Sequence, residues 1–98
     1  MEDITCEELK QRLEKGEKLN ILDVREPYEY EQANIKGLLI PLASLQTRIH
    51  EIEKWKDEEI IVHCRSGRRS ENAKQFLMMH GFKKVRNLIG GIERFLSH

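Results

Sequence analysis

One cysteine in the chain stands in a setting that favours nucleophilic chemistry. Cys64 follows an apolar run, residues 60–63, and precedes a short loop and a helical pattern that begins near Arg69. An apolar run before such a loop is typical of a buried parallel strand, and open α/β sheets bind ligands at the carboxyl ends of such strands. Helix N-termini and nearby cations stabilise a thiolate. The pattern therefore predicts that Cys64 is a nucleophile with a lowered pKa.

The residues after the cysteine favour an anionic substrate. They include three arginines, at Arg65, Arg68 and Arg69. Three cations beside a buried strand end are costly unless they face an anion. Gly67 permits a positive φ, so that several backbone N–H groups can converge on one point. Two simpler interpretations stay open: Arg65 and Arg68 lie on a solvated turn, and the cysteine is a small buried hydrophobic residue.

Composition describes one soluble domain over residues 1–98. The chain is 39% hydrophobic and 35% charged with a formal net charge of zero, so no overall charge balance favours nucleic acid or membrane as a partner. The charges are unevenly distributed. Residues 1–31 carry ten acidic and five basic side chains, whereas residues 63–94 carry eight basic and two acidic ones. The basic part contains the cysteine loop, which fits an anionic substrate or an acidic partner surface.

The cysteines favour a reducing compartment, and the histidines show no pattern typical of a metal site. Cys6 and Cys64 form neither a disulfide framework nor a CxxC pair, and the four histidines show no metal-ligand spacing. We therefore expect no metal and no cofactor. An acidic start without a following apolar stretch argues against a signal peptide, and no apolar segment approaches the ~18 residues of a membrane helix. The cytoplasm is the expected location.

The rest of the chain alternates strand and helix patterns. Strands are expected at residues 19–24, 38–40, 60–63 and 83–88. Helices are expected from Thr5, with Glu8 completing a capping box, to Gly16, and over residues 27–33, 42–55, 69–80 and 92–97. This alternation predicts an α/β domain with a mainly parallel sheet.

Two polar residues stand out within these elements. Asp23, near a strand end, is expected either to cap a loop or pair with an arginine, or to be a solvated turn residue. His80 is expected on the inward face of the helix that follows the cysteine loop, as a satisfied face residue rather than a base. Ala73, Phe76 and Leu77 share that face.

With these residues laid out, the chain resembles a single-domain rhodanese over nearly all of its length. Four segments carry the likeness, in the order 22–30, 35–37, 64–70 and 90–92. The segment 64–70 is similar to the family's catalytic loop. Ala33 and Asn34 stand where the family usually has Gly-His, and Phe95 lies near the position of a frequent tryptophan.

The resemblance implies a five-stranded parallel sheet flanked by helices and a thiosulfate sulfurtransferase activity. Cys64 would take a sulfane sulfur from thiosulfate or a similar donor as a persulfide and pass it to a thiol or cyanide. A protein donor or acceptor is an alternative partner. The implied site comprises Cys64 as the catalytic residue, Arg65, Ser66, Gly67, Arg68 and Arg69 as substrate-binding residues, and Asp23 and Arg25 as supporting residues.

Two other functions compete with this hypothesis. Phosphatases that share the rhodanese fold place five residues between cysteine and arginine, whereas four separate Cys64 from Arg69, and Ser70 holds the next position. The shorter loop favours sulfur over phosphate. A sulfur carrier or docking module that never turns over free thiosulfate is the non-enzymatic alternative, and only turnover with small donors and acceptors separates it from an enzyme.

Overall fold

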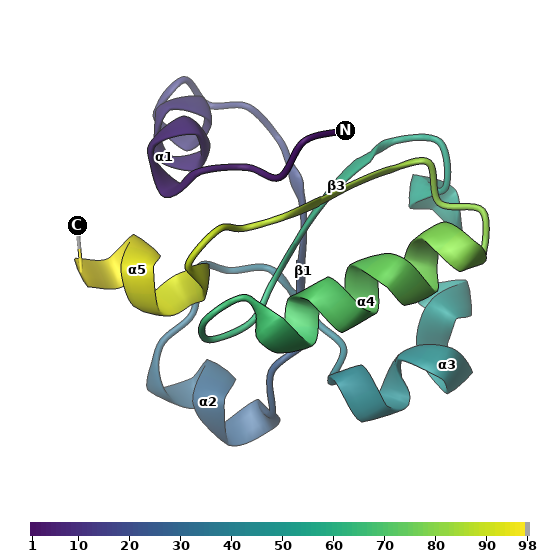
Figure 1. The fold of residues 1–98 in the computed structure, drawn as a ribbon. Helices are drawn as coiled ribbons and strands as arrows, with labels where there is room; N and C mark the ends of the chain where they lie inside the picture. The colour runs from purple at the N-terminus through teal and green to yellow at the C-terminus, as the bar shows by residue number, and fades with distance from the viewer. Residues whose placement is uncertain (98) are drawn as a thin grey trace.

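A four-stranded parallel sheet forms the centre of the chain in the computed structural model, which describes residues 1–97. The strands lie in the order β2-β1-β3-β4, and every adjacent pair is parallel. Figure 1 labels the two central strands, β1 and β3. Their bounds are Asn20–Asp23 for β1, Leu38–Leu39 for β2, Glu59–His63 for β3 and Lys84–Asn87 for β4. The prediction of an α/β fold with a parallel sheet is confirmed.

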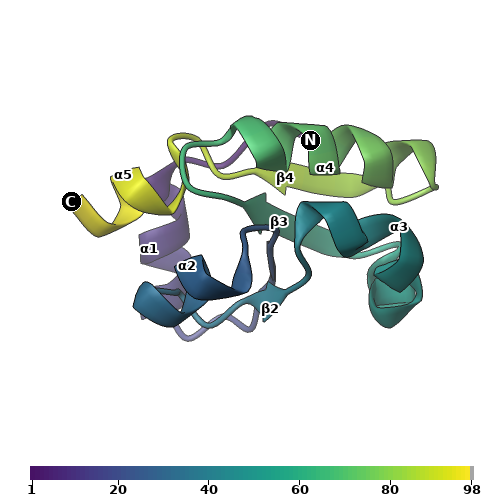
Figure 2. The same cartoon turned by 90° about the horizontal axis from the view of Figure 1, so that it is seen from below.

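Seven helical segments connect and cover the strands within residues 1–97. They are α1 (Cys6–Glu14), α2 (Pro27–Gln32), η1 (Leu42–Ser44), α3 (Leu45–Arg48), η2 (Ile49–Trp55), α4 (Arg68–Met79) and α5 (Gly91–Ser97). Thr5 caps α1 by accepting a hydrogen bond from the N–H of Glu8 at 3.1 Å. Pro27 begins α2, where its fixed φ suits the first helical position. Figure 2 shows α4 running beside β4.

The expected fifth strand is reduced to a single bridge. Ile4 pairs with Leu88 outside the named strands, through hydrogen bonds from Ile4 N–H to Asn87 O at 3.0 Å and from Ile89 N–H to Ile4 O at 2.9 Å. The strand cannot continue, because Thr5 already serves as the N-cap of α1. The implied count of five strands is therefore wrong for the described residues.

Two predicted helical features also differ. The pattern over residues 42–55 is divided into η1, α3 and η2, with non-helical backbone at Ile52 (φ −115°, ψ 16°). Its apolar stripe still faces the core, since Leu45 and Ile52 are buried. His80 is exposed at the end of α4 and not on the inward face, because it is the C-cap residue, where the helical backbone stops.

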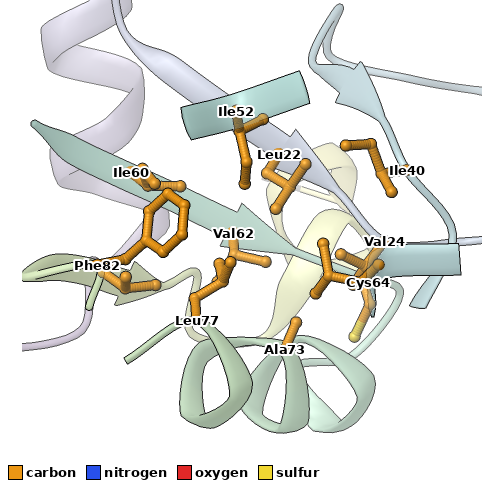
Figure 3. Close-up of a cluster of buried hydrophobic side chains, with 12 residues drawn as sticks. Leu22, Val24, Ile40, Ile52, Ile60, Val62, Cys64, Ala73, Leu77 and Phe82 are labelled. Carbon is orange, nitrogen blue, oxygen red and sulfur yellow. The ribbon is translucent and has the colours of Figure 1, made fainter. Parts of the chain in front are cut away.

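The sheet separates two hydrophobic clusters. Neighbouring strand residues alternate between them: Ile60 and Val62 belong to the larger cluster, and Ile61 belongs to the smaller one. The larger cluster packs against α4 and η2, and Cys64 is part of it (Figure 3). The smaller cluster packs against α1 and α5, which contact each other (Figure 1). Both faces of the sheet are therefore covered.

The parallel strands bring the predicted site residues to one edge. Asp23, the last residue of β1, is in register with His63, the last residue of β3, and Val24 N–H donates to His63 O at 3.1 Å. Cys64 leaves β3 at this edge and enters the loop that begins α4. The carboxyl edge of the sheet therefore positions the cysteine loop.

Candidate active site

Hydrogen-bond donors converge on the sulfur of Cys64. The backbone N–H of Gly67 donates to Sγ at 3.2 Å, and that of Ser70 donates at 3.3 Å. The Ser70 hydroxyl lies 3.3 Å from the same sulfur. Gly67 has a φ of +111°, which an L side chain rarely adopts, so glycine is required to curl the loop. The loop therefore forms a cradle around Sγ, as the sequence predicted.

The cradle changes the acidity of the thiol. Burial acts to raise the pKa of Cys64, but hydrogen bonds from the Ser70 hydroxyl and from the backbone N–H groups of Ser70, Gly67 and Ser66 outweigh it, so the pKa is lowered. Burial raises the pKa of Cys6, which lies in the smaller hydrophobic cluster. The lowered pKa of Cys64 therefore owes more to the Ser70 side chain and to backbone N–H groups than to the arginines emphasised from the sequence.

A residue from the neighbouring strand supports the loop from behind. The Ser70 hydroxyl donates to Oδ1 of Asn87 at 2.6 Å, and Nδ2 of Asn87 donates to Gly67 O at 3.0 Å. Both Ser70 and Asn87 are buried. Sequence reasoning missed their function. Ser70 is the last residue of the loop motif, so its function could have been predicted from the sequence. Nothing in the sequence relates Asn87 to a loop that lies 20 residues earlier.

Two of the three loop arginines already have carboxylate partners. Arg69 forms a bidentate pair with Glu29 of α2, at 2.7 and 2.9 Å, and this pair lowers the pKa of Glu29 to about 2. Arg65 pairs with Glu93 of α5 at 3.0 Å on the surface. Arg68 is exposed and forms no ion pair with a described residue. Arg65 and Arg69, which were predicted to face an anionic substrate, are therefore already paired with carboxylates of the protein.

The start of α5 holds the loop in place. Ile92 N–H donates to Cys64 O at 2.9 Å, and Glu93 N–H donates to Arg65 O at 3.0 Å. Gly91 has a φ of +65°, and a Cβ at this position would overlap the carbonyl of Arg65 and lie 2.7 Å from Cys64 O. Glycine is therefore required where α5 approaches the cysteine.

Asp23 and Arg25 form a buried ion pair beneath the site. Nε of Arg25 lies 2.9 Å from Oδ1 of Asp23, and Nη2 lies 2.7 Å from Oδ2. Arg25 also donates to the carbonyls of Ala33 and Glu29, which ties the pair to α2. Of the two alternatives for Asp23, pairing with an arginine is confirmed. Nε2 of the buried His63 lies 3.6 Å from Oδ2 of Asp23, and burial lowers the pKa of His63, which favours a neutral ring.

A pocket of about 350 Å³ opens beside the cysteine loop. Residues of α2, the cysteine loop and α5 form its wall, namely Arg25, Tyr28, Glu29, Gln32, Ala33, Arg65, Ile92 and Glu93. Cys64 does not line it, but Arg65 follows Cys64 directly and Ile92 bonds to its carbonyl. The pocket therefore lies next to the backbone of the cysteine loop.

Residues 1–97 contain no group of three or more histidine, cysteine, aspartate or glutamate side chains arranged to hold a metal ion. Within the same residues, no helix is long and apolar enough to cross a membrane.

Comparison with known proteins agrees with the fold. Residues 5–98 match the Rhodanese-like domain family, and the chain belongs to this family. It is 38% identical over 97 residues to a protein of Allochromatium vinosum named "Sulfurtransferase", covering 98% of this chain and 89% of that protein. It is 45% identical over 91 residues to the "Putative sulfur carrier protein YrkF" of Bacillus subtilis strain 168, covering 92% of this chain.

The chain spans 48% of the length of that Bacillus relative. Among solved structures, the crystal structure of a rhodanese-like domain protein from Staphylococcus aureus superimposes with a TM-score of 0.87 at 27% identity, covering 97% of this chain and 91% of that chain. The names of these relatives support a role in sulfur transfer, and the resemblance to a single-domain rhodanese is confirmed.

Proposed function

We propose that this chain is a sulfurtransferase that carries a sulfane sulfur as a persulfide on Cys64. The observation that supports it most directly is the convergence of the Gly67 and Ser70 N–H groups on Sγ, at 3.2 and 3.3 Å. These donors stabilise the thiolate, and the same cradle suits the negative charge of an outer persulfide sulfur.

The proposed reaction proceeds in two steps through a covalent intermediate. The Cys64 thiolate attacks the outer sulfur of thiosulfate or another sulfane-sulfur donor. The donor's S–S bond breaks, its electron pair leaves with sulfite or the donor thiolate, and Cys64 holds the persulfide. A thiolate or cyanide then attacks the outer sulfur and restores the Cys64 thiolate. A free thiol needs a reducing compartment, and we propose the cytoplasm.

The test is steady-state turnover with thiosulfate and cyanide, measured as thiocyanate released. The wild type and Cys6→Ser should turn over at the same rate, because Cys6 belongs to a hydrophobic cluster away from the loop. Cys64→Ser should be inactive. Equal activity of Cys64→Ser and wild type would contradict the proposal.

A sulfur carrier is the second candidate, and a relative's name favours it. The Bacillus relative is named as a carrier, and the present chain covers about half of it. A carrier would form the Cys64 persulfide in stoichiometric amount but would not turn over with small acceptors. Loading without release of thiocyanate would therefore favour the carrier, with a protein as donor or acceptor.

A further inference from the structure

The charges at the mouth of the cysteine loop balance one another. Arg69 is held by both carboxylate oxygens of Glu29, and Arg65 is paired with Glu93. Arg68 has no ion-pair partner among the described residues, and in formal charge alone its +1 balances the −1 of a Cys64 thiolate. A dianion is attracted by an excess of positive charge, and this mouth has none.

Releasing Arg69 for a substrate is unfavourable. Its pair with Glu29 has two short hydrogen bonds, and the Glu29 side chain is only 13% exposed. Arg69 also interacts electrostatically with Cys64, so a freed guanidinium would lie within range of the reacting sulfur. Glu29 therefore engages a cation that would otherwise be available to the sulfonate of thiosulfate.

The pocket between α2 and α5 offers room for an organic group instead. Tyr28, Ala33 and Ile92 provide apolar surface in its wall, and Arg65 connects it to the cysteine. A thiosulfate ion has no group to place there. An organic persulfide, R–S–SH, presents one outer sulfur to Cys64 and places its R group beside the loop.

We propose that the sulfur donor is an organic persulfide whose R group carries no net negative charge and occupies this pocket, and that Glu29 sets this preference over thiosulfate by holding Arg69. The proposal rests on the sulfur transfer proposed above. The Cys64 thiolate attacks the outer sulfur, and the donor's S–S bond breaks. The electron pair leaves with R–S⁻, which takes up the proton that the new persulfide loses, so no external oxidant or reductant is needed.

The test compares single-turnover loading of Cys64 from thiosulfate and from cysteine persulfide, followed by intact mass. Glu29→Gln keeps an oxygen for the Glu26 N–H that Glu29 now accepts, at 3.0 Å, but loses the charge that holds Arg69. It should raise the rate from thiosulfate, and increase the ratio of the thiosulfate rate to the cysteine persulfide rate by about tenfold, the value of one charge-assisted contact. Comparing variants cancels the different intrinsic reactivities of the donors.

Two further variants complete the experiment. Tyr28→Ala removes an exposed wall of the pocket, with the Tyr28 residue 64% exposed, and should slow loading from cysteine persulfide alone. Glu51→Gln breaks a surface pair with Arg48 outside the site and should change neither rate.

Three results are decisive. Provided that wild-type Cys64 is loaded, the inference is overturned if Glu29→Gln leaves the loading rate from thiosulfate unchanged or lowers it. It is also overturned if Tyr28→Ala changes the loading rates from both donors equally. Failure of the folded wild type to load Cys64 from either donor refutes the proposed sulfur transfer itself, and the inference with it. Faster loading from thiosulfate in Glu29→Gln, together with slower loading from cysteine persulfide alone in Tyr28→Ala, supports both the inference and the proposed sulfur transfer.

Discussion

Ser70 presents two groups to the sulfur of Cys64, its backbone N–H and its hydroxyl, each 3.3 Å from Sγ. The N–H is fixed by the first turn of α4, and the hydroxyl is close to Asn87 on β4. The acidity of the thiol therefore depends on the junction between the cysteine loop and the neighbouring strand.

Ser70→Ala should raise the pKa of Cys64, because it removes the hydroxyl and keeps the N–H. Alkylation by iodoacetamide near neutral pH should slow by about tenfold, the effect of one hydrogen bond to a charged sulfur. The pH profile of the rate measures the pKa directly. Ser66→Ala is the matched control, since Ser66 supports the thiolate through its N–H alone. Equal profiles for Ser70→Ala and wild type would show that the hydroxyl is irrelevant.

The Glu29–Arg69 pair should make stability depend on acid pH. The pair lowers the pKa of Glu29 in the folded protein to about 2 from its ordinary value of 4.5. Glu29 is therefore protonated at a lower pH in the folded state than in the unfolded state. The stabilisation from the pair is fully present above pH 4.5 and is lost as the pH falls towards 2. Urea midpoints measured across this window should fall more steeply for the wild type than for Glu29→Gln. Parallel curves would contradict the ion pair.

Arg25→Ala should destabilise the fold strongly, because it leaves the fully buried Asp23 without a counter-ion. Breaking a buried pair costs about 3–5 kcal/mol, whereas an exposed pair contributes about 0–1 kcal/mol. Arg48→Ala, which breaks the exposed pair with Glu51, is the control. Denaturant unfolding of both variants gives the comparison. Similar losses in the two would mean that the Asp23–Arg25 pair is not a structural support.

Gly91→Ala should displace the cysteine loop. The added Cβ would overlap the Arg65 carbonyl, whereas a Cβ at Gly16, which also has a positive φ (+79°), would meet nothing within 4 Å. Gly16→Ala should therefore cost only the strain of a left-handed residue, about 1–2 kcal/mol. Gly91→Ala should lose more stability and should also slow alkylation of Cys64. If Cys64 reacts normally in folded Gly91→Ala, the contact with α5 does not position the loop.

Local sequence signals were sufficient for the strand–loop–helix unit that carries the site. The apolar run before Cys64 became β3, Gly67 adopted the positive φ that the loop needs, and α4 begins one residue from the expected position, at Arg68. Each of these features depends on residues close together in the chain. For this reason the cysteine cradle was predictable.

Features that depend on distant residues were not predictable. The partners of Arg69 and Arg65, Glu29 and Glu93, are 40 and 28 residues away, and only the fold brings them together. In the sequence these arginines look like unpaired cations, but the fold pairs them with carboxylates. The fifth strand failed for a local reason, because the cap of α1 at Thr5 leaves Ile4 alone to pair with β4's extension.

Intact mass spectrometry after incubation with a sulfane-sulfur donor tests the central claim most directly. Wild type and Cys6→Ser, given thiosulfate or cysteine persulfide, should gain the mass of one sulfur atom and lose it with dithiothreitol, and Cys64→Ser should gain nothing at that site. Only four residues separate Cys64 from Arg69, and this short loop favours sulfur over phosphate, so we also expect no hydrolysis of p-nitrophenyl phosphate. An unchanged mass of the folded wild type with both donors, or Cys64-dependent phosphatase turnover, would contradict the account.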